Sequence, residues 1–227
     1  MKRIGLLGGM SWESSAEHYR IVNEATRDRL GGLHSADCVL RSVDFTDIEV
    51  LQRSSRWEEA GAALAADAAA LVAAGAELIV LCTNTMHAIG VAVEVPFLLV
   101  ADTTADAVGA RGLQTVGLLA TGYTMEQDFY VGRLRDRHGL TVLVPDEPDR
   151  RIVHSVICDE LCVGVVDDGS RDEYRRIMGV LADRGAEGIL LGRTEIDLLV
   201  GPQDSPVPLF DTTLLHAERA VELALAE

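Results

Sequence analysis

The stretch Ile4-Gly5-Leu6-Leu7 forms the first apolar run of the chain, and a near copy, Val116-Gly117-Leu118-Leu119, lies at its middle. Each run is followed by a segment rich in Gly, Ala and hydroxyl-bearing residues. Short apolar runs without polar alternation are typical of parallel strands that are covered on both faces. The two stretches therefore predict equivalent strands, each of which ends in a Gly-containing loop.

A second pair of similar stretches follows at almost the same separation. Gly75-Ala76-Glu77-Leu78-Ile79-Val80-Leu81 is similar to Gly185-Ala186-Glu187-Gly188-Ile189-Leu190-Leu191. Two matches at nearly one spacing indicate an internal repeat of about half the chain. Continuing this alignment past the strands pairs Cys82 with Gly192 and Thr83 with Arg193.

The repeat and the alternation of strands with helical stretches predict an α/β fold. We expect two pseudo-symmetric, doubly wound lobes with mainly parallel sheets and a cleft between them. Residues 1–98 and 210–227 are expected to form lobe 1, and residues 99–209 lobe 2. Because ligands bind at the carboxyl ends of strands in open α/β sheets, the loops after Leu81 and Leu191 are expected to face one ligand.

The composition limits the classes of partner. The chain has 227 residues, 48% of them apolar, and a formal net charge of -16, so we expect neither nucleic acid nor an anionic membrane surface as a partner. An anionic substrate would need a local positive charge in its site. The first residues do not resemble a secretory signal and no run approaches the ~20 apolar residues of a membrane span, so a cytoplasmic protein is expected.

Cofactor and metal motifs are absent from the sequence. The Gly8-Gly9 loop lacks nucleotide-binding spacing, and Lys2 is the chain's only lysine, in no pattern that suggests a pyridoxal site. Cys158 and Cys162 are four residues apart on a predicted helix and share one face. They are interpreted as small buried hydrophobes rather than as a metal pair, since no cluster has zinc spacing. No cofactor and no metal are expected.

Four motifs carry a resemblance to a known family. They are Gly8-Gly9-Met10-Ser11-Trp12-Glu13-Ser14, Cys82-Thr83-Asn84-Thr85-Met86-His87, Tyr123-Thr124-Met125 and Gly192-Arg193-Thr194-Glu195-Ile196. In this order they resemble the cofactor-independent aspartate/glutamate racemases over essentially the whole chain, and most of all the branch selective for L-aspartate and L-glutamate. The resemblance implies a small anionic amino acid or dicarboxylate as substrate, a homodimer, and proton transfer at the α-carbon without pyridoxal phosphate.

The sequence departs from that family at both catalytic cysteine positions. Such racemases use one cysteine just before the Asn-Thr of the second motif and another after the Gly of the fourth. Here Thr83 and Arg193 occupy these positions, although the L-selective branch resembles this chain in having Thr at the first. Arg stays protonated near neutral pH and cannot act as a general base. Arg193 is predicted either to bind a carboxylate or stabilise an enolate-like intermediate, or to close the site through an ion pair with Glu195.

The remaining candidate site residues follow from the same motifs. Cys82 is expected to face the core if Thr83 faces the ligand, since successive strand residues point to opposite faces; a thiol turned toward the ligand is the alternative. His87 is either an acid/base group or a helix-face residue. The loop residues are predicted to contact substrate, with turn and helix-cap chemistry as the alternative: Met10, Ser11, Gln52, Asn84, Thr85, Tyr123, Thr124, Thr194 and Glu195.

These observations predict an isomerase that acts at the α-carbon of a small acidic amino acid or related dicarboxylate, with altered or one-sided proton transfer. Two alternatives stay open. One is a lyase or decarboxylase on the same scaffold, and the other is a catalytically inactive homologue that binds an acidic ligand.

Overall fold

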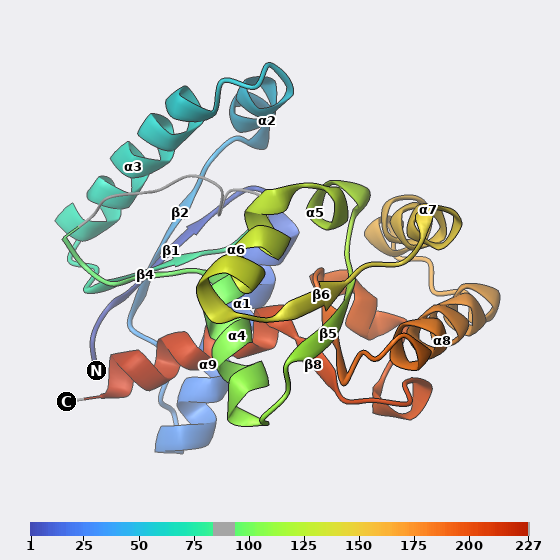
Figure 1. Ribbon diagram of the computed structural model, residues 1–227. Helices are drawn as coiled ribbons and strands as arrows, with labels where there is room; N and C mark the ends of the chain where they lie inside the picture. The colour runs from blue at the N-terminus through green and yellow to red at the C-terminus, as the bar shows by residue number, and fades with distance from the viewer. Residues whose placement is uncertain (84–93, 227) are drawn as a thin grey trace. The chain divides into compact units, whose positions relative to one another are not determined.

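The computed structural model describes residues 1–83 and 94–226 (Figure 1). Within these ranges the chain divides into two compact units, Met1–Val100 with Leu214–Glu227, and Ala101–Thr213. Each unit contains a four-stranded sheet whose strands are all parallel. The predicted α/β class with two doubly wound lobes is confirmed.

The first unit has the strand order β2-β1-β3-β4. Its strands are β1 (Ile4–Gly8), β2 (Cys38–Ser42), β3 (Leu78–Leu81) and β4 (Phe97–Leu98). Its described helices are α1 (Trp12–Leu30), α2 (Phe45–Arg53), α3 (Trp57–Ala73) and most of α9 (Thr212–Leu225).

Alternate residues of β1 and β3 supply the two faces of this sheet, as strand geometry requires. Ile4, Leu6, Leu78 and Val80 pack with residues of α1 and α9. The opposite-facing residues pack with α2 and α3. They are Leu7, Ile79 and Leu81. The continuous apolar runs of these strands are therefore explained by burial on both sides.

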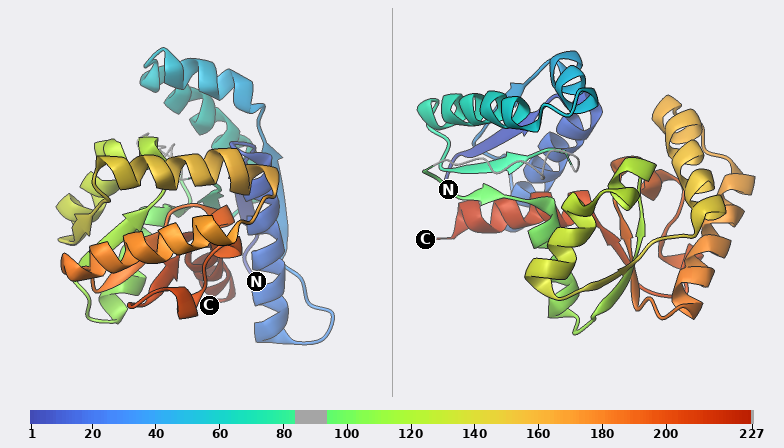
Figure 2. Two further views of the ribbon diagram at one scale, coloured as in Figure 1. Left: turned by 90° about the vertical axis from the view of Figure 1, so that its right-hand side faces the viewer. Right: turned by 45° about the horizontal axis from the view of Figure 1, so that its top comes forward.

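The second unit repeats this topology with the order β6-β5-β7-β8. Its strands are β5 (Thr115–Leu119), β6 (Thr141–Leu143), β7 (Gly188–Leu191) and β8 (Leu209–Asp211). Its helices include α4 (Val100–Ala110), α5 (Gly122–Glu126), α6 (Asp128–His138), α7 (Glu147–Ser155) and α8 (Asp168–Asp183). Figure 2 shows α7 and α8 together on one face of this sheet, with α4 and α6 on the other.

Two glycines show how closely the repeats match. A Cβ atom on Gly5 would lie 2.7 Å from Cδ1 of Ile79, and one on Gly117 would lie 2.7 Å from Cδ1 of Ile189. A helix packs closely over each glycine, since the next contacts include Leu71 of α3 or Leu181 of α8. Glycine at the centre of each first strand thus leaves room for the equivalent isoleucine of the neighbouring strand.

Short helical turns complete the second unit. After α7 the chain forms a π-helical turn, η2 (Val156–Glu160), and a 3₁₀ turn, η3 (Leu161–Val163). After β7 it forms the 3₁₀ turns η4 (Thr194–Leu198) and η5 (Pro202–Asp204). No helix in the described ranges is long and apolar enough to span a bilayer.

Candidate active site

Equivalent backbone hydrogen bonds end β3 and β7. The amide of Cys82 donates to Leu7 O at 2.9 Å, and the amide of Gly192 donates to Leu119 O at 2.8 Å. These bonds confirm the alignment of Cys82 with Gly192 made from sequence. Thr83 and Arg193 are therefore each the second residue beyond equivalent strand ends, where α/β sheets bind ligands.

Cys82 belongs to the core of the first unit. Its side chain is fully buried among apolar residues and its Sγ lies 3.7 Å from Val80 O. Burial raises the pKa of this thiol far above its usual value. The core role predicted for Cys82 is confirmed, which leaves it unsuited to proton transfer near neutral pH.

Thr83 follows at the strand end and is 9% exposed. Its amide donates to Leu81 O at 2.9 Å, which turns the chain away from β3. Asn84, Thr85 and His87, which complete this motif, lie outside the described residues.

Arg193 and Glu195 form a two-point ion pair. Arg193 Nη2 lies 2.9 Å from Glu195 Oε1, and Arg193 Nε lies 3.2 Å from Glu195 Oε2. Thr194 donates from its hydroxyl to the same Oε2 at 2.9 Å. The side chains of Arg193 and Glu195 are 29% and 15% exposed, so solvent screens this pair only in part. The ion pair named as an alternative role for Arg193 is thus formed.

The ion pair favours the charged form of both Arg193 and Glu195. Burial disfavours charge on Arg193, but Glu195 more than offsets it and leaves the pKa of Arg193 above its ordinary value. Burial likewise acts to raise the pKa of Glu195, and Arg193 with its hydrogen bonds lowers it overall. Both groups are therefore charged near neutral pH, and Arg193 is not a proton acceptor.

Two cysteines lie beside this ion pair, a position that was not predicted from the sequence. Cys158 and Cys162 are exposed, so their prediction as buried hydrophobes is wrong. Arg193 Nη2 lies 3.7 Å from Cys162 Sγ, and that sulfur lies 3.8 Å from Glu195 Oε1. The apolar residues of the same turns, Val156, Ile157 and Leu161, take the buried face instead.

A histidine continues this cluster toward the loop after β5. His154 Nδ1 lies 3.6 Å from Cys158 Sγ and accepts a hydrogen bond from the Gly122 amide at 3.3 Å. The spacing of His154, Cys158 and Cys162, each four residues after the last, was the available sequence signal for a shared helix face. Polar and thiol groups thus extend over the carboxyl ends of both β5 and β7.

The other predicted contact residues lie at strand ends and helix starts. Tyr123 is 37% exposed, whereas Thr124 is 1% exposed and its hydroxyl lies 3.3 Å from that of Thr121. Met10 is buried in the core against α2 and α3. Ser11 accepts a hydrogen bond from the Ser14 amide as the N-cap of α1, which is the predicted helix-cap alternative. Gln52 is half-buried on α2. Their contact with substrate stays a prediction.

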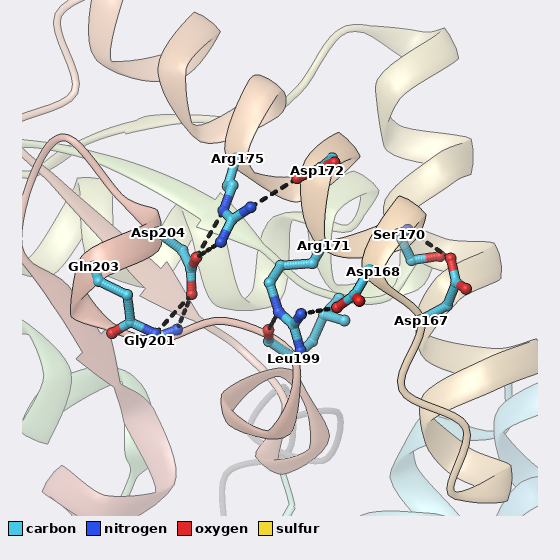
Figure 3. Close-up of polar contacts among 10 residues, drawn as sticks. All are labelled: Asp167, Asp168, Ser170, Arg171, Asp172, Arg175, Leu199, Gly201, Gln203 and Asp204. Carbon is cyan, nitrogen blue, oxygen red and sulfur yellow. Dashed lines mark hydrogen bonds and ion pairs between the residues drawn. The ribbon is translucent and has the colours of Figure 1, made fainter.

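Two arginines of α8 hold the loop that follows η4 (Figure 3). Arg171 Nε donates to Leu199 O at 2.7 Å, and Arg175 Nε lies 2.7 Å from Asp204 Oδ1. Asp204 also accepts from the Gly201 amide at 2.8 Å. A cavity of about 290 Å³ lies here, but its two arginines are bound to these acceptors. These contacts hold in place the loop that directly follows Arg193 and Glu195 in the chain.

A metal site is not formed by the part of the chain that the structure describes. In residues 1–83 and 94–226, no three His, Cys, Asp or Glu side chains converge in a way that would hold an ion. The cluster around Arg193 instead offers a guanidinium whose geometry is suited to binding a carboxylate.

Two repeated parallel α/β lobes, with polar loops at the ends of the equivalent strands β3 and β7, match the doubly wound, two-lobed fold of racemases. Residues 7–220 match the family described as Asp/Glu/Hydantoin racemase, and the chain belongs to this family.

Solved structures agree with this assignment. A candidate Asp/Glu racemase from Yersinia pestis is 49% identical, with a TM-score of 0.96 and 100% of both chains covered. An aspartate racemase homologue from Pyrococcus horikoshii OT3 is 31% identical, with a TM-score of 0.88 and 100% of both chains covered. Glutamate racemase from Francisella tularensis, solved with D-glutamate, is 18% identical with a TM-score of 0.63 over 98% of this chain and 80% of that one, and shares the fold.

Proposed function

We propose that this protein is an isomerase that acts without a cofactor at the α-carbon of a small acidic amino acid or related dicarboxylate. Membership of the racemase family supports the reaction class. The equivalence of Thr83 and Arg193 at the ends of β3 and β7 supports their acting on one substrate. We further propose that the protein works as a cytoplasmic homodimer.

The family match carries the reaction class in this proposal, and the charged Arg193 beside Glu195 determines the role of Arg193. A racemase removes the α-proton on one face and returns a proton on the other, so it needs two acid/base groups. Arg193 cannot accept a proton, and its fork matches the geometry of a carboxylate. Its role is therefore to bind a substrate carboxylate or stabilise the carbanion, with Glu195 holding the guanidinium until substrate replaces it.

The substrate-binding residues in this proposal come from the loops at the carboxyl ends of the strands and from α2. Backbone amides and hydroxyls at helix starts bind carboxylates well. The proposed set is Met10, Ser11, Gln52, Asn84, Thr85, Tyr123, Thr124, Thr194 and Glu195, with Thr83 as the acid/base candidate of the first lobe.

Two other functions have a specific observation in their favour. A lyase or decarboxylase needs only one proton delivery, which suits a site where Arg193 replaces an acid/base group. An inactive acidic-ligand-binding protein is favoured by the Glu195 carboxylate, which already occupies the guanidinium.

The test is incubation of the full chain with each enantiomer of aspartate and glutamate in deuterated buffer, followed by NMR at the α-position. Loss of the α-proton with inversion is the expected result. Exchange with retention, or loss of carbon dioxide or ammonia, would replace the isomerase by one-sided chemistry. Binding by calorimetry without exchange would leave only the inactive homologue.

A further inference from the structure

We propose that Cys162 is the proton-transfer group of the second lobe and supplies from η3 the thiol that the end of β7 lacks. This inference rests on the proposed function. It begins from the position of Cys162 Sγ, which lies 3.7 Å from Arg193 Nη2, the terminal nitrogen of the residue that stands at the catalytic position.

The surroundings of Cys162 suit proton transfer. The residue is exposed, so a ligand bound at the strand end has access to its sulfur. Arg193 provides a positive charge next to the sulfur, and Glu195 Oε1 lies 3.8 Å away as an acceptor for the thiol proton. A thiol between a cation and a carboxylate has a stable partner in both protonation states.

The resting state of this thiol is the protonated one. Partial burial of the thiol raises the pKa of Cys162, Glu195 raises it further, and Arg193 acts in the opposite direction without cancelling them. Cys162 therefore begins as the proton donor. Once a base on the opposite face has broken the Cα–H bond and left the electron pair on the α-carbon, the Cys162 S–H proton moves to that carbon.

The thiolate that remains is neutralised by Arg193. In the reverse direction this thiolate takes the α-proton, the S–H bond forms again, and the electron pair of the C–H bond stays on carbon. Protons and charges balance without any further reactant. Arg193 thus has two uses in one site, carboxylate binding and thiolate stabilisation.

Cys158 provides a matched control within the same cluster. It is also exposed, but its sulfur lies 3.6 Å from His154 Nδ1, whereas that of Cys162 contacts Arg193 and Glu195. The comparison of Cys162→Ala with Cys158→Ala therefore separates the proposed role from a general need for thiols on this face.

The experiment measures inversion and α-proton exchange of L- and D-aspartate and L- and D-glutamate in deuterated buffer for the wild type and both variants. We expect Cys162→Ala to lower the rate of inversion by ~100-fold or more, in the range for loss of a general acid/base, and Cys158→Ala to stay within about threefold. Cys162→Ser should move the pH dependence of the residual rate to higher pH, because a hydroxyl ionises at higher pH than a thiol. A purely structural role would leave that dependence unchanged.

Each other outcome has a definite meaning. A wild type that exchanges no α-proton overturns the proposed function and this inference with it. An active wild type with a Cys162→Ala rate within threefold overturns the role of Cys162 alone and leaves the proposed function intact. If the two alanine variants lose inversion activity equally, with unchanged melting temperatures, the proton-transfer role assigned to Cys162 is overturned.

Discussion

Arg193 and Glu195, two residues apart after β7, hold each other through two contacts of 2.9 and 3.2 Å. The pair places one positive and one negative group beside the Cys162 thiol. Their effects on this thiol are opposite, because Glu195 raises its pKa and Arg193 lowers it. Partial burial has the largest effect and raises the pKa of Cys162, and these two charges adjust it in opposite directions.

These opposing charges predict opposite shifts in thiol reactivity for two variants. In a Cys158→Ala background, Glu195→Gln should move the pH midpoint of Cys162 alkylation by iodoacetamide to lower pH, because a carboxylate that opposes the thiolate is removed. Arg193→Gln should move it to higher pH, because the stabilising cation is lost. Mass spectrometry of the Cys162 peptide measures both rates. Shifts of the same sign would contradict the arrangement described.

The fold could be predicted from sequence because the two repeats carry the same constraints. The packing that demands Gly5 and Gly117 recurs in both lobes, so the same residue types recur at the same spacing. The direction of Cys82 followed from strand alternation, a purely local rule. Its full burial agrees with that rule.

The cysteine cluster could not be predicted in the same way. Which face of a short helix is buried depends on its packing partners, and η2 departs from regular α-helical geometry. Free cysteines are usually buried, and that tendency led to the wrong prediction for Cys158 and Cys162. The spacing of the two cysteines indicates that they share a helix face. It does not indicate that this face points toward Arg193, which is distant in sequence.

The glycine pair predicts a larger defect in the first lobe than in the second. Gly5→Ala should lower the free energy of unfolding by about 1–3 kcal/mol, because a Cβ would lie 2.7 Å from Cδ1 of Ile79 and 2.9 Å from the Cβ of Ala76. Gly117→Ala should cost less, because the atoms nearest its Cβ are the ends of the Ile189 and Leu181 side chains, which can shift. Ile79→Val removes that Cδ1 atom and should offset part of the Gly5→Ala defect. Urea unfolding of single and double variants measures this coupling.

The matched control is Gly179→Ala, in α8, where an added Cβ would contact nothing within 4 Å. It should be neutral or stabilising by up to about 1 kcal/mol, since alanine favours a helix. If Gly5→Ala proved equally harmless, the close packing of β1 against Ile79 would be disproved.

A buried histidine predicts loss of stability on mild acidification. His18 Nδ1 lies 2.8 Å from Ser14 O, and its Nε2 lies 3.3 Å from Nδ1 of His216. Burial lowers the pKa of His18 below its ordinary value, although Ser14 and Glu17 act to raise it. The unfolded chain therefore takes up a proton first as the pH falls. This contribution to stability is complete above about pH 6.5 and is lost as the pH falls toward the folded-state pKa.

Replacing His18 by Phe should accordingly reduce the dependence of the unfolding free energy on pH between about 7 and 5, even if the variant is less stable at every pH. His34→Gln, at an exposed position, is the control and should keep the wild-type dependence. An unchanged slope in His18→Phe would show that other groups cause the acid sensitivity.

The final prediction concerns the position where the family has its second cysteine. Arg193→Cys should invert L-aspartate or L-glutamate faster than Arg193→Ser, because a thiol with an ordinary pKa of about 8.5 then stands just beyond the end of β7. The change also leaves Glu195 without its guanidinium, at an expected cost of about 1–3 kcal/mol in stability.

Arg193→Ser is the matched control, because it carries the same loss of the ion pair without a thiol. The Arg193→Cys substitution should also restore inversion in a Cys162→Ala background, since the new thiol replaces the one removed. NMR at the α-position in deuterated buffer measures all three proteins. A folded Arg193→Cys variant no more active than Arg193→Ser would show that residue 193 does not face the α-carbon, and the proposed role of Arg193 would have to be abandoned.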